Sequence, residues 1–408
     1  MDRPHTHKSH TNLSAIFSRL NGEGWRRALK AAGIATLAFL LSFVLAQPFS
    51  FSAGTLMSNP DTKDFNLTDF YNIIADSRPV RALDDKIVIV DIDNTSRDDV
   101  TDIIEMLSVM NPAAVGIDVT FNEPHADDSR LLHAIENCPD LVLAVGLCAM
   151  PGQKDTFMVD DYSFFYNTHH DIITHGAVNL PSKSDGSTIR DFPVIFQSQF
   201  GKTISPFAVA LARKADADAV RLLESRGNKT ETIDFPSRTF NGIPWPELPD
   251  RPAEVEGKVV VVGAMNEIGD MHRTPVSDKM SGVMIHAYAI STILNGNYYT
   301  VAASWLNLGL AFLLCFLLAM ASLSLRVQIK GLVLRMVQVL VLYLIIRIGY
   351  SMFVDHRVII DFSFSLLMLT FALFACDVWI GSSYIFQNLF THFKNRGRSN
   401  AAHNRHTT

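Results

Sequence analysis

Residues 86–93 read KIVIVDID and residues 114–121 read AVGIDVTF, and these two runs decide the fold class. Each is a continuous apolar stretch rich in β-branched residues, which is typical of a strand buried on both faces of a parallel sheet. Between them, residues 96–110 repeat apolar side chains at helical spacing, and Asn111–Pro112 ends that helix. Residues 86–121 therefore predict a strand–helix–strand unit with a right-handed crossover.

The same alternation of strands and helices continues along the chain. Further apolar runs predict strands at 141–147, 176–180, 231–235 and 258–263. Amphipathic stretches predict helices at 67–75, 127–136, 206–214 and 283–294. The proline-rich stretch 242–252 (GIPWPELPDRP) predicts a surface loop. The fold class is therefore an α/β domain with a mostly parallel sheet.

Four apolar runs are long enough to cross a membrane. A bilayer core requires roughly 20 apolar residues, and lipid cannot satisfy open backbone groups, so each run is predicted to be a helix. The four predicted transmembrane helices are residues 28–47, 302–325, 332–354 and 358–380. They divide the rest of the chain into an N-terminal segment 1–27, a large domain 48–301 and a basic tail 381–408.

The distribution of charge orients these helices. Residues 1–30 and 381–408 each carry a net charge of +4, whereas residues 31–300 carry −16. Basic residues favour the cytoplasmic side, which predicts cytoplasmic termini and an extracytoplasmic domain. The acidic domain is a poor partner for phosphate backbones, so nucleic acid is not an expected partner. The first span is interpreted as an uncleaved anchor, and a cleaved signal peptide is the alternative.

Acidic residues follow the predicted strands, at the edge where open α/β sheets bind ligands. Asp91 and Asp93 end the first strand, and Asp118 and Glu123 follow the second. Asn266, Glu267 and Asp270 follow the strand at 258–263. These residues are candidate ligand-binding groups. In the alternative interpretation they only cap helices and brace loops.

The order of these motifs resembles the CHASE2 extracellular sensor domain. The series runs from VIVDID and AVGIDVTFNEP through SDGSTIRDFPV to GKVVVVGAMNEIGDMHRTPV, and it closes with SGVMIHAYAISTILNG before three spans. The resemblance covers roughly residues 86–300 and implies a bacterial inner-membrane sensory receptor with a periplasmic ligand-binding domain. It makes His286 a further site candidate, with a core histidine as the alternative. Arg190 is either an anion anchor or a counter-ion for the surrounding acids.

No catalytic activity, cofactor or metal is expected. Proteins that resemble this one usually carry a kinase or cyclase after the last span, whereas residues 381–408 are too few to form a core. A partner is therefore expected to supply the output, and the alternative is a structural envelope scaffold. A less favoured alternative is a haloacid-dehalogenase-like phosphatase, with Asp91 as nucleophile and Asp93 as general acid. The histidines at 169, 170 and 175 are interpreted as a solvated cluster rather than as metal ligands.

Charged residues inside the predicted spans suggest specific contacts. Charges in lipid tend to pair or to face other helices, so we expect Arg347 to contact Asp361 and Arg335 to contact Asp377. Independent snorkelling to the interface is the alternative. Small residues along 302–325 favour close helix packing, which suggests a homo-oligomer or a separate membrane partner.

Overall fold

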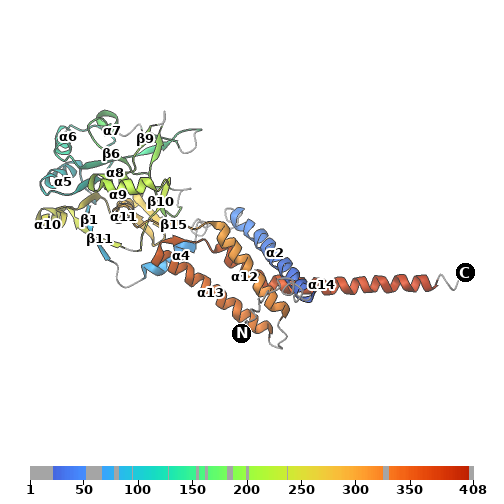
Figure 1. The fold of residues 1–408 in the computed structure, drawn as a ribbon. Coiled ribbons are helices and arrows are strands. Elements are labelled where there is room, and N and C mark those ends of the chain that lie inside the picture. The colour runs from blue at the N-terminus through green and yellow to red at the C-terminus, as the bar shows by residue number, and fades with distance from the viewer. Residues whose placement is uncertain are drawn as a thin grey trace, which may run out of the picture. The chain divides into compact units, whose positions relative to one another are not determined.

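The computed structural model describes residues 22–51, 67–77, 82–93, 95–126, 128–152, 156–160, 164–181, 187–198, 202–236, 238–324 and 330–403. The chain divides into two compact units. The first unit comprises residues 1–56, 301–352 and 360–408, and the second comprises 57–300 together with 353–359 (Figure 1). The first unit contains the apolar helices, and the second, here called the outer domain, contains the α/β fold.

A six-stranded parallel sheet is the centre of the outer domain. Its strand order is β11-β1-β12-β2-β3-β6, and all five neighbouring pairs are parallel. In this spatial order the strands are Arg238–Pro244, Ala82–Asp91, Val259–Gly263, Ala114–Ile117, Leu141–Val145 and His175–Ala177. The predicted α/β class and mostly parallel sheet are thereby confirmed.

Both faces of this sheet are buried in apolar clusters. Strands β1, β12, β2 and β3 contribute to both clusters, because alternate side chains point to opposite faces. Ile87 and Ile89 of β1 belong to one apolar cluster, with α8 (Phe207–Ala215) and α11 (Gly282–Asn295). Val88 and Val90 belong to a second cluster, with α5 (Arg97–Val109), α6 (Asp128–Glu136) and α10 (Pro252–Val255). A continuous apolar run is therefore what each central strand requires.

The sequence predicted a strand–helix–strand unit over residues 86–121, and in the structure a third strand, β12, lies between the two strands of that unit. β1 and β2 are not neighbours, since β12 lies between them, with Ile87 opposite Val259 and Val259 opposite Ala114. The helix that joins β1 to β2 begins where predicted. Ser96 caps α5, accepting a hydrogen bond from the backbone of Asp99, whose side chain accepts one from the Ser96 backbone.

The proline-rich stretch at 242–252 is not the surface loop that the sequence suggested. Its first residues complete β11, which pairs with β1, and a 3₁₀ helix, η3, follows at Trp245–Asp250. Ile243 and Leu248 are fully buried against the sheet. Proline is compatible with this edge strand because an edge strand need not donate every backbone N–H.

Smaller elements complete the outer domain. A second sheet has the order β4-β5-β8-β9, and β7 pairs with β10 and β13 with β14. These strands are Leu147–Ala149, Thr156–Val159, Phe196–Ser198, Thr203–Ile204, Asp191–Pro193, Thr230–Thr232, Met271–Thr274 and Ser277–Ser281. The remaining elements are the helices α4 (Leu67–Asp76), α7 (Phe164–His169), α9 (Ala217–Ser225) and η4 (Ile268–Asp270), and the short strands β15 (Thr300–Val301) and β16 (Val358–Ile359).

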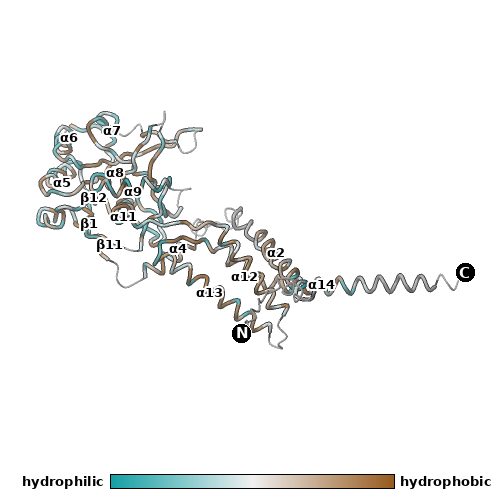
Figure 2. The backbone as a smooth tube through the Cα atoms, viewed as in Figure 1, coloured by the Kyte–Doolittle hydropathy of each residue, from teal (hydrophilic) through white to brown (hydrophobic). Residues whose placement is uncertain are grey.

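In the described part of the chain, four helices are long and apolar enough to cross a membrane. They are α2 (Gly22–Phe51), α12 (Ser304–Ser324), α13 (Lys330–His356) and α14 (Ser363–His403), and Figure 2 shows apolar residues along α12 and α13. The last span begins later than the predicted residue 358, because Val358–Ile359 is extended. The helix also continues beyond residue 380, so the described part of the predicted tail is helical.

Small residues bring α2, α12 and α14 together. Ala31, Ala35 and Ala38 recur along the buried face of α2. At Gly33 a Cβ atom would lie only 2.9 Å from the ring of Trp379 on α14, so a larger residue would require that ring to shift. Close approach of this kind is how helices pack where no hydrophobic effect drives association.

Candidate functional site

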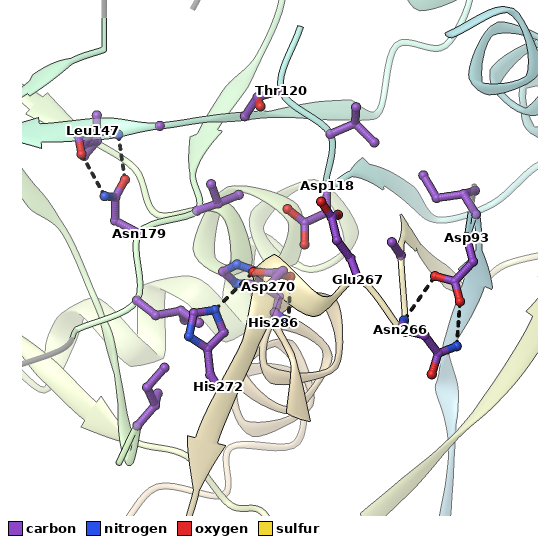
Figure 3. Close-up of a pocket in the computed structure, with 18 of the residues that line it drawn as sticks. Asp93, Asp118, Thr120, Leu147, Asn179, Asn266, Glu267, Asp270, His272 and His286 are labelled. Atoms are coloured by element: carbon purple, nitrogen blue, oxygen red, sulfur yellow. Dashed lines mark hydrogen bonds and ion pairs between the residues drawn. The ribbon is translucent and has the colours of Figure 1, made fainter. Parts of the chain in front are cut away.

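A cavity of about 910 Å³ lies at the carboxyl ends of the parallel strands (Figure 3). It is formed where the loops after β1, β2 and β12 meet the start of α11. Parallel sheets place such loops at one edge, and ligands of open α/β folds bind there. The cavity is lined by Ile92, Asp93, Thr95, Asp118, Val119, Thr120, Gly146, Leu147, Asp160, Val178, Asn179, Leu180, Ile189, Ala264, Asn266, Glu267, Asp270, His272, Gly282 and His286.

Asp93 and Asn266 join two of these loops. Asn266 donates from its backbone nitrogen to Asp93 Oδ1 at 3.1 Å and from Nδ2 to Asp93 Oδ2 at 2.6 Å. These hydrogen bonds stabilise the charged form, so the pKa of Asp93 is lowered. The loop after β1 is thereby fixed to the loop after β12.

Asp118 ends β2 and points toward Glu267 and Asp270 in Figure 3. Burial, together with the nearby carboxylates of Asp270 and Glu267, raises the pKa of Asp118 to about 7. Three carboxyl groups from two loops thus face one space, and burial disfavours the charged form of Asp118.

Asp270 is held by groups on both sides. Its Oδ2 accepts a hydrogen bond from the Gly282 backbone at 2.9 Å, and its Oδ1 lies 3.1 Å from His272 Nε2. Asp270 approaches Gly282 so closely that a Cβ there would lie 2.5 Å from Asp270 Oδ2 and would displace the carboxylate. An acidic side chain at the N-terminus of α11 also meets the positive end of the helix dipole.

His286 lies one turn further along α11 and is 4% exposed. Its ring packs edge-on against Phe207, with centroids 5.3 Å apart. Burial lowers the pKa of His286 to about 4, so the imidazole is neutral at physiological pH. His286 is therefore a packed histidine that also lines the cavity, which joins the two interpretations offered by the sequence.

The opposite side of the cavity is formed by residues that the sequence did not single out. Asn179 closes one wall by exchanging two hydrogen bonds with the Leu147 backbone, at 2.7 and 2.8 Å. His272 comes from β13 and Asp160 from the residue after β5. Asn179 had been placed inside a predicted strand that ends at Ala177 in the structure. Because the predicted strand extended to residue 180, the sequence did not indicate that Asn179 lies at the strand end.

The cavity is strongly acidic. It is lined by five carboxyl side chains, two histidines and, among the described residues, no lysine or arginine; the acids are Asp93, Asp118, Asp160, Glu267 and Asp270. The part of the chain that the structure describes contains no group of three or more His, Cys, Asp or Glu side chains arranged to hold a metal ion. The electrostatic potential inside the cavity therefore favours a positively charged ligand.

The sequence candidates Asp91, Glu123 and Arg190 lie outside the cavity lining. Asp91 is partly buried, and its Oδ1 accepts hydrogen bonds from the backbones of Met265 and Asp93, at 3.1 and 3.3 Å. Glu123 is exposed in the loop after β2. These two hydrogen bonds tie the Asp91 carboxylate to the loops that follow β1 and β12.

Arg190 forms a bidentate ion pair. Its Nε and Nη2 donate to the two carboxylate oxygens of Asp69 on α4, at 2.7 and 2.6 Å. Asp69 is 4% exposed. This geometry matches the counter-ion interpretation of Arg190, because a fork that already holds a carboxylate is occupied.

The histidines at 169, 170 and 175 are spread over two elements. His169 ends α7, whereas His175 begins β6. His175 Nδ1 lies 2.9 Å from the carbonyl oxygen of Ile173. Burial lowers the pKa of His175 to about 4. His175 is thus partly buried, in contrast to the solvated cluster that was expected.

One of the two expected charge pairs between spans is present. Arg335 Nη2 lies 3.7 Å from Asp377 Oδ2. Arg347 and Asp361 form no ion pair, and the Arg347 guanidinium lies 5.9 Å from the ring centre of Tyr350. Asp361 Oδ1 instead accepts a hydrogen bond from the Ser363 backbone at 3.0 Å. Asp361 caps the first turn of α14, so its carboxylate has a hydrogen-bond donor in its own segment.

The family comparison agrees with the order of motifs along the sequence. The model of the CHASE2 domain matches residues 41–323, which is more than half of the chain. The chain belongs to the CHASE2 domain family. No curated protein and no solved structure matches it significantly. The CHASE2 match includes the outer domain with its acidic cavity and extends over α12. An extracellular sensor domain and apolar helices therefore lie in one matched region.

Proposed function

We propose that this CHASE2 protein is a membrane sensor that binds a small, positively charged ligand in the cavity at the carboxyl ends of sheet β11-β1-β12-β2-β3-β6. The observation that carries the proposal is the lining of five carboxyl groups without a lysine or arginine among the described residues. A volume of about 910 Å³ suits a small molecule.

The electrostatics of Asp118 support a cationic ligand. Its pKa of about 7 means that burial and neighbouring carboxylates disfavour its charged form. A bound cation would reverse part of this penalty by pairing with Asp118 and Asp270. Ligand binding would then lower the pKa of Asp118 and release a proton near neutral pH.

The proposal places the protein in a bacterial inner membrane, with the outer domain in the periplasm and both termini in the cytoplasm. The support is the net charge of +4 on residues 1–30 and on residues 381–408, against −16 on residues 31–300. An extracytoplasmic cavity meets ligands from outside the cell, which is what a sensor requires.

The output is proposed to come from a second copy or another membrane protein rather than from catalysis by this chain. The small residues Ala311 and Ala319 of α12 are buried within the chain's own bundle, whereas a Cβ at Gly309 would meet nothing within 4 Å. We expect an oligomer or a co-purifying partner in mild detergent. Deletion of Lys394–Thr408 should leave that association intact, and a monomeric, partner-free protein in several detergents would contradict it.

Thermal unfolding of the full chain in lipid nanodiscs tests ligand binding. The probes are putrescine, arginine amide and, as an anionic comparison, succinate. At least one cation should raise the unfolding midpoint of the wild type, and succinate should not. Asp270→Asn should abolish the shift, and Asp98→Asn, an exposed carboxylate change on α5, should preserve it. A cation shift that survives Asp270→Asn, or a shift with succinate alone, would refute the cavity as a cation site.

A further inference from the structure

The last turn of α13 and the connection to α14, residues 353–359 and here called the α13–α14 turn, belong to the outer domain rather than to the helical unit. Residues 353–359 form one compact unit with residues 57–300. The Phe353 ring is 1% exposed, stacks on Tyr299 with centroids 4.8 Å apart, and contacts Tyr71 of α4 at 5.9 Å. An aromatic cluster buried to this extent fixes the turn in place.

A polar cluster reinforces this docking. Asp234 is 4% exposed, its Oδ2 lies 3.5 Å from Arg357 Nη2, and its Oδ1 accepts a hydrogen bond from the Tyr299 hydroxyl at 3.2 Å. The Arg357 carbonyl accepts a hydrogen bond from the Thr300 backbone at 2.8 Å. Arg357 also adopts a positive φ of 52°, which a non-glycine residue keeps only when its surroundings hold it.

Helix α11 connects this cluster with the cavity. At its first turn, the Gly282 backbone donates to Asp270 in the cavity wall. Ten residues later, Thr292 Oγ1 accepts a hydrogen bond from the Asp234 backbone at 3.1 Å. Ten residues of helix span about 15 Å. Most of α11 is buried, so movement at one end displaces packed neighbours along its length.

We propose that α11 and the Asp234–Arg357 ion pair form a transmission path from the cavity to the α13–α14 turn. The chain continues from α11 into α12, which links the cavity to the first of the three C-terminal spans. The ion pair would hold the connection between the other two spans, α13 and α14. All three C-terminal spans would then respond to the state of the cavity. The inference rests on the proposed function only in taking the cavity as the input.

Hydrogen–deuterium exchange of the full chain in lipid nanodiscs tests the docking. Arg357→Gln should speed amide exchange in residues 298–301 and 353–359 at least tenfold, because the ion pair is lost. Arg251→Gln is the matched control, since it removes another ion-paired arginine of the outer domain, one that contacts Glu247 and Glu254. Tyr299→Phe, which keeps the stacked ring, is the second variant if Arg357→Gln does not fold. Unchanged exchange in the turn would overturn the docking.

The transmission is tested by a cavity change that needs no ligand, so failure of ligand binding leaves this result readable. Gly282→Ala should displace the Asp270 side chain, because the added Cβ would lie 2.5 Å from it. This change should alter exchange in residues 353–359 at least threefold in the wild-type background and not in the Arg357→Gln background. Asp270→Asn is the second cavity variant. No effect on the turn, or the same effect in both backgrounds, would overturn the path.

Discussion

Asn266 donates two hydrogen bonds to Asp93, one from its backbone nitrogen at 3.1 Å and one from Nδ2 at 2.6 Å. The pair joins the loops that follow two neighbouring strands, β1 and β12. It also explains why Asp93 keeps its charge in a cavity lined by other acids, since hydrogen bonds to a carboxylate favour the ionised form.

Asn266→Ala should therefore weaken the fold at neutral pH by roughly 1 kcal/mol, the net contribution of a typical intramolecular hydrogen bond. Because the pKa of Asp93 is lowered in the folded state, this stabilisation exists above the unfolded pKa near 3.8 and is lost as pH falls. The difference in unfolding midpoint between variant and wild type should shrink below pH 4. A difference that grows in acid would contradict the pairing.

Asp118→Asn should have the opposite pH dependence. The pKa of Asp118 is raised to about 7, so the folded state holds a proton that the unfolded state releases above pH 4. Wild-type stability from this group falls by up to about 1.4 kcal/mol per pH unit between pH 4 and 7. The variant's midpoint should rise relative to wild type across that window and stay level above it. A pH-independent difference would show that Asp118 is not buried among acids.

Gly176→Ala should destabilise the outer domain by about 1–3 kcal/mol, the usual cost of overpacking. A Cβ at Gly176 would lie 2.5 Å from the backbone Cα of Phe207, which cannot move without displacing α8. Gly269→Ala is the matched control, because a Cβ there would meet nothing within 4 Å. Equal unfolding midpoints for the two variants would contradict the packing of β6 against α8.

Arg190→Gln should destabilise the domain by about 3 kcal/mol, since it removes the bidentate partner of the buried Asp69. Arg130→Gln is the matched control. Its pairs with Asp102 and Glu105 are exposed, so this change should shift the unfolding midpoint much less than Arg190→Gln. If Arg190 were an anion anchor instead, its replacement would change anion affinity and leave the unfolding midpoint nearly constant.

The fold class was predictable because its signals are local. The strand that includes Val88 and Val90 needs apolar side chains on both faces, and this requirement is visible as an unbroken run. The acidic edge followed from the rule that parallel strands end together, which correctly brought Asp93, Asp118 and Asp270 to one cavity.

What could not be predicted depends on contacts between distant segments. β12 lies between β1 and β2 although 141 residues of chain separate Ile117 from Val259. The docking of Phe353 on Tyr299 is equally non-local, since a sequence shows only that both are aromatic. Asp361 was misjudged for a different reason, namely that helix capping by a residue at a span boundary competes with pairing between spans.

The most direct test of the sensor account asks on which side of the membrane the cavity opens. Ile268, on the loop beside Glu267, is 93% exposed, so Ile268→Cys with Cys148→Ser places a thiol at the cavity rim. Thr391→Cys is the control on the far part of α14. A membrane-impermeant maleimide should label the thiol at position 268 in intact spheroplasts, and the thiol at position 391 only after permeabilisation. Labelling of position 268 only after permeabilisation would contradict the account.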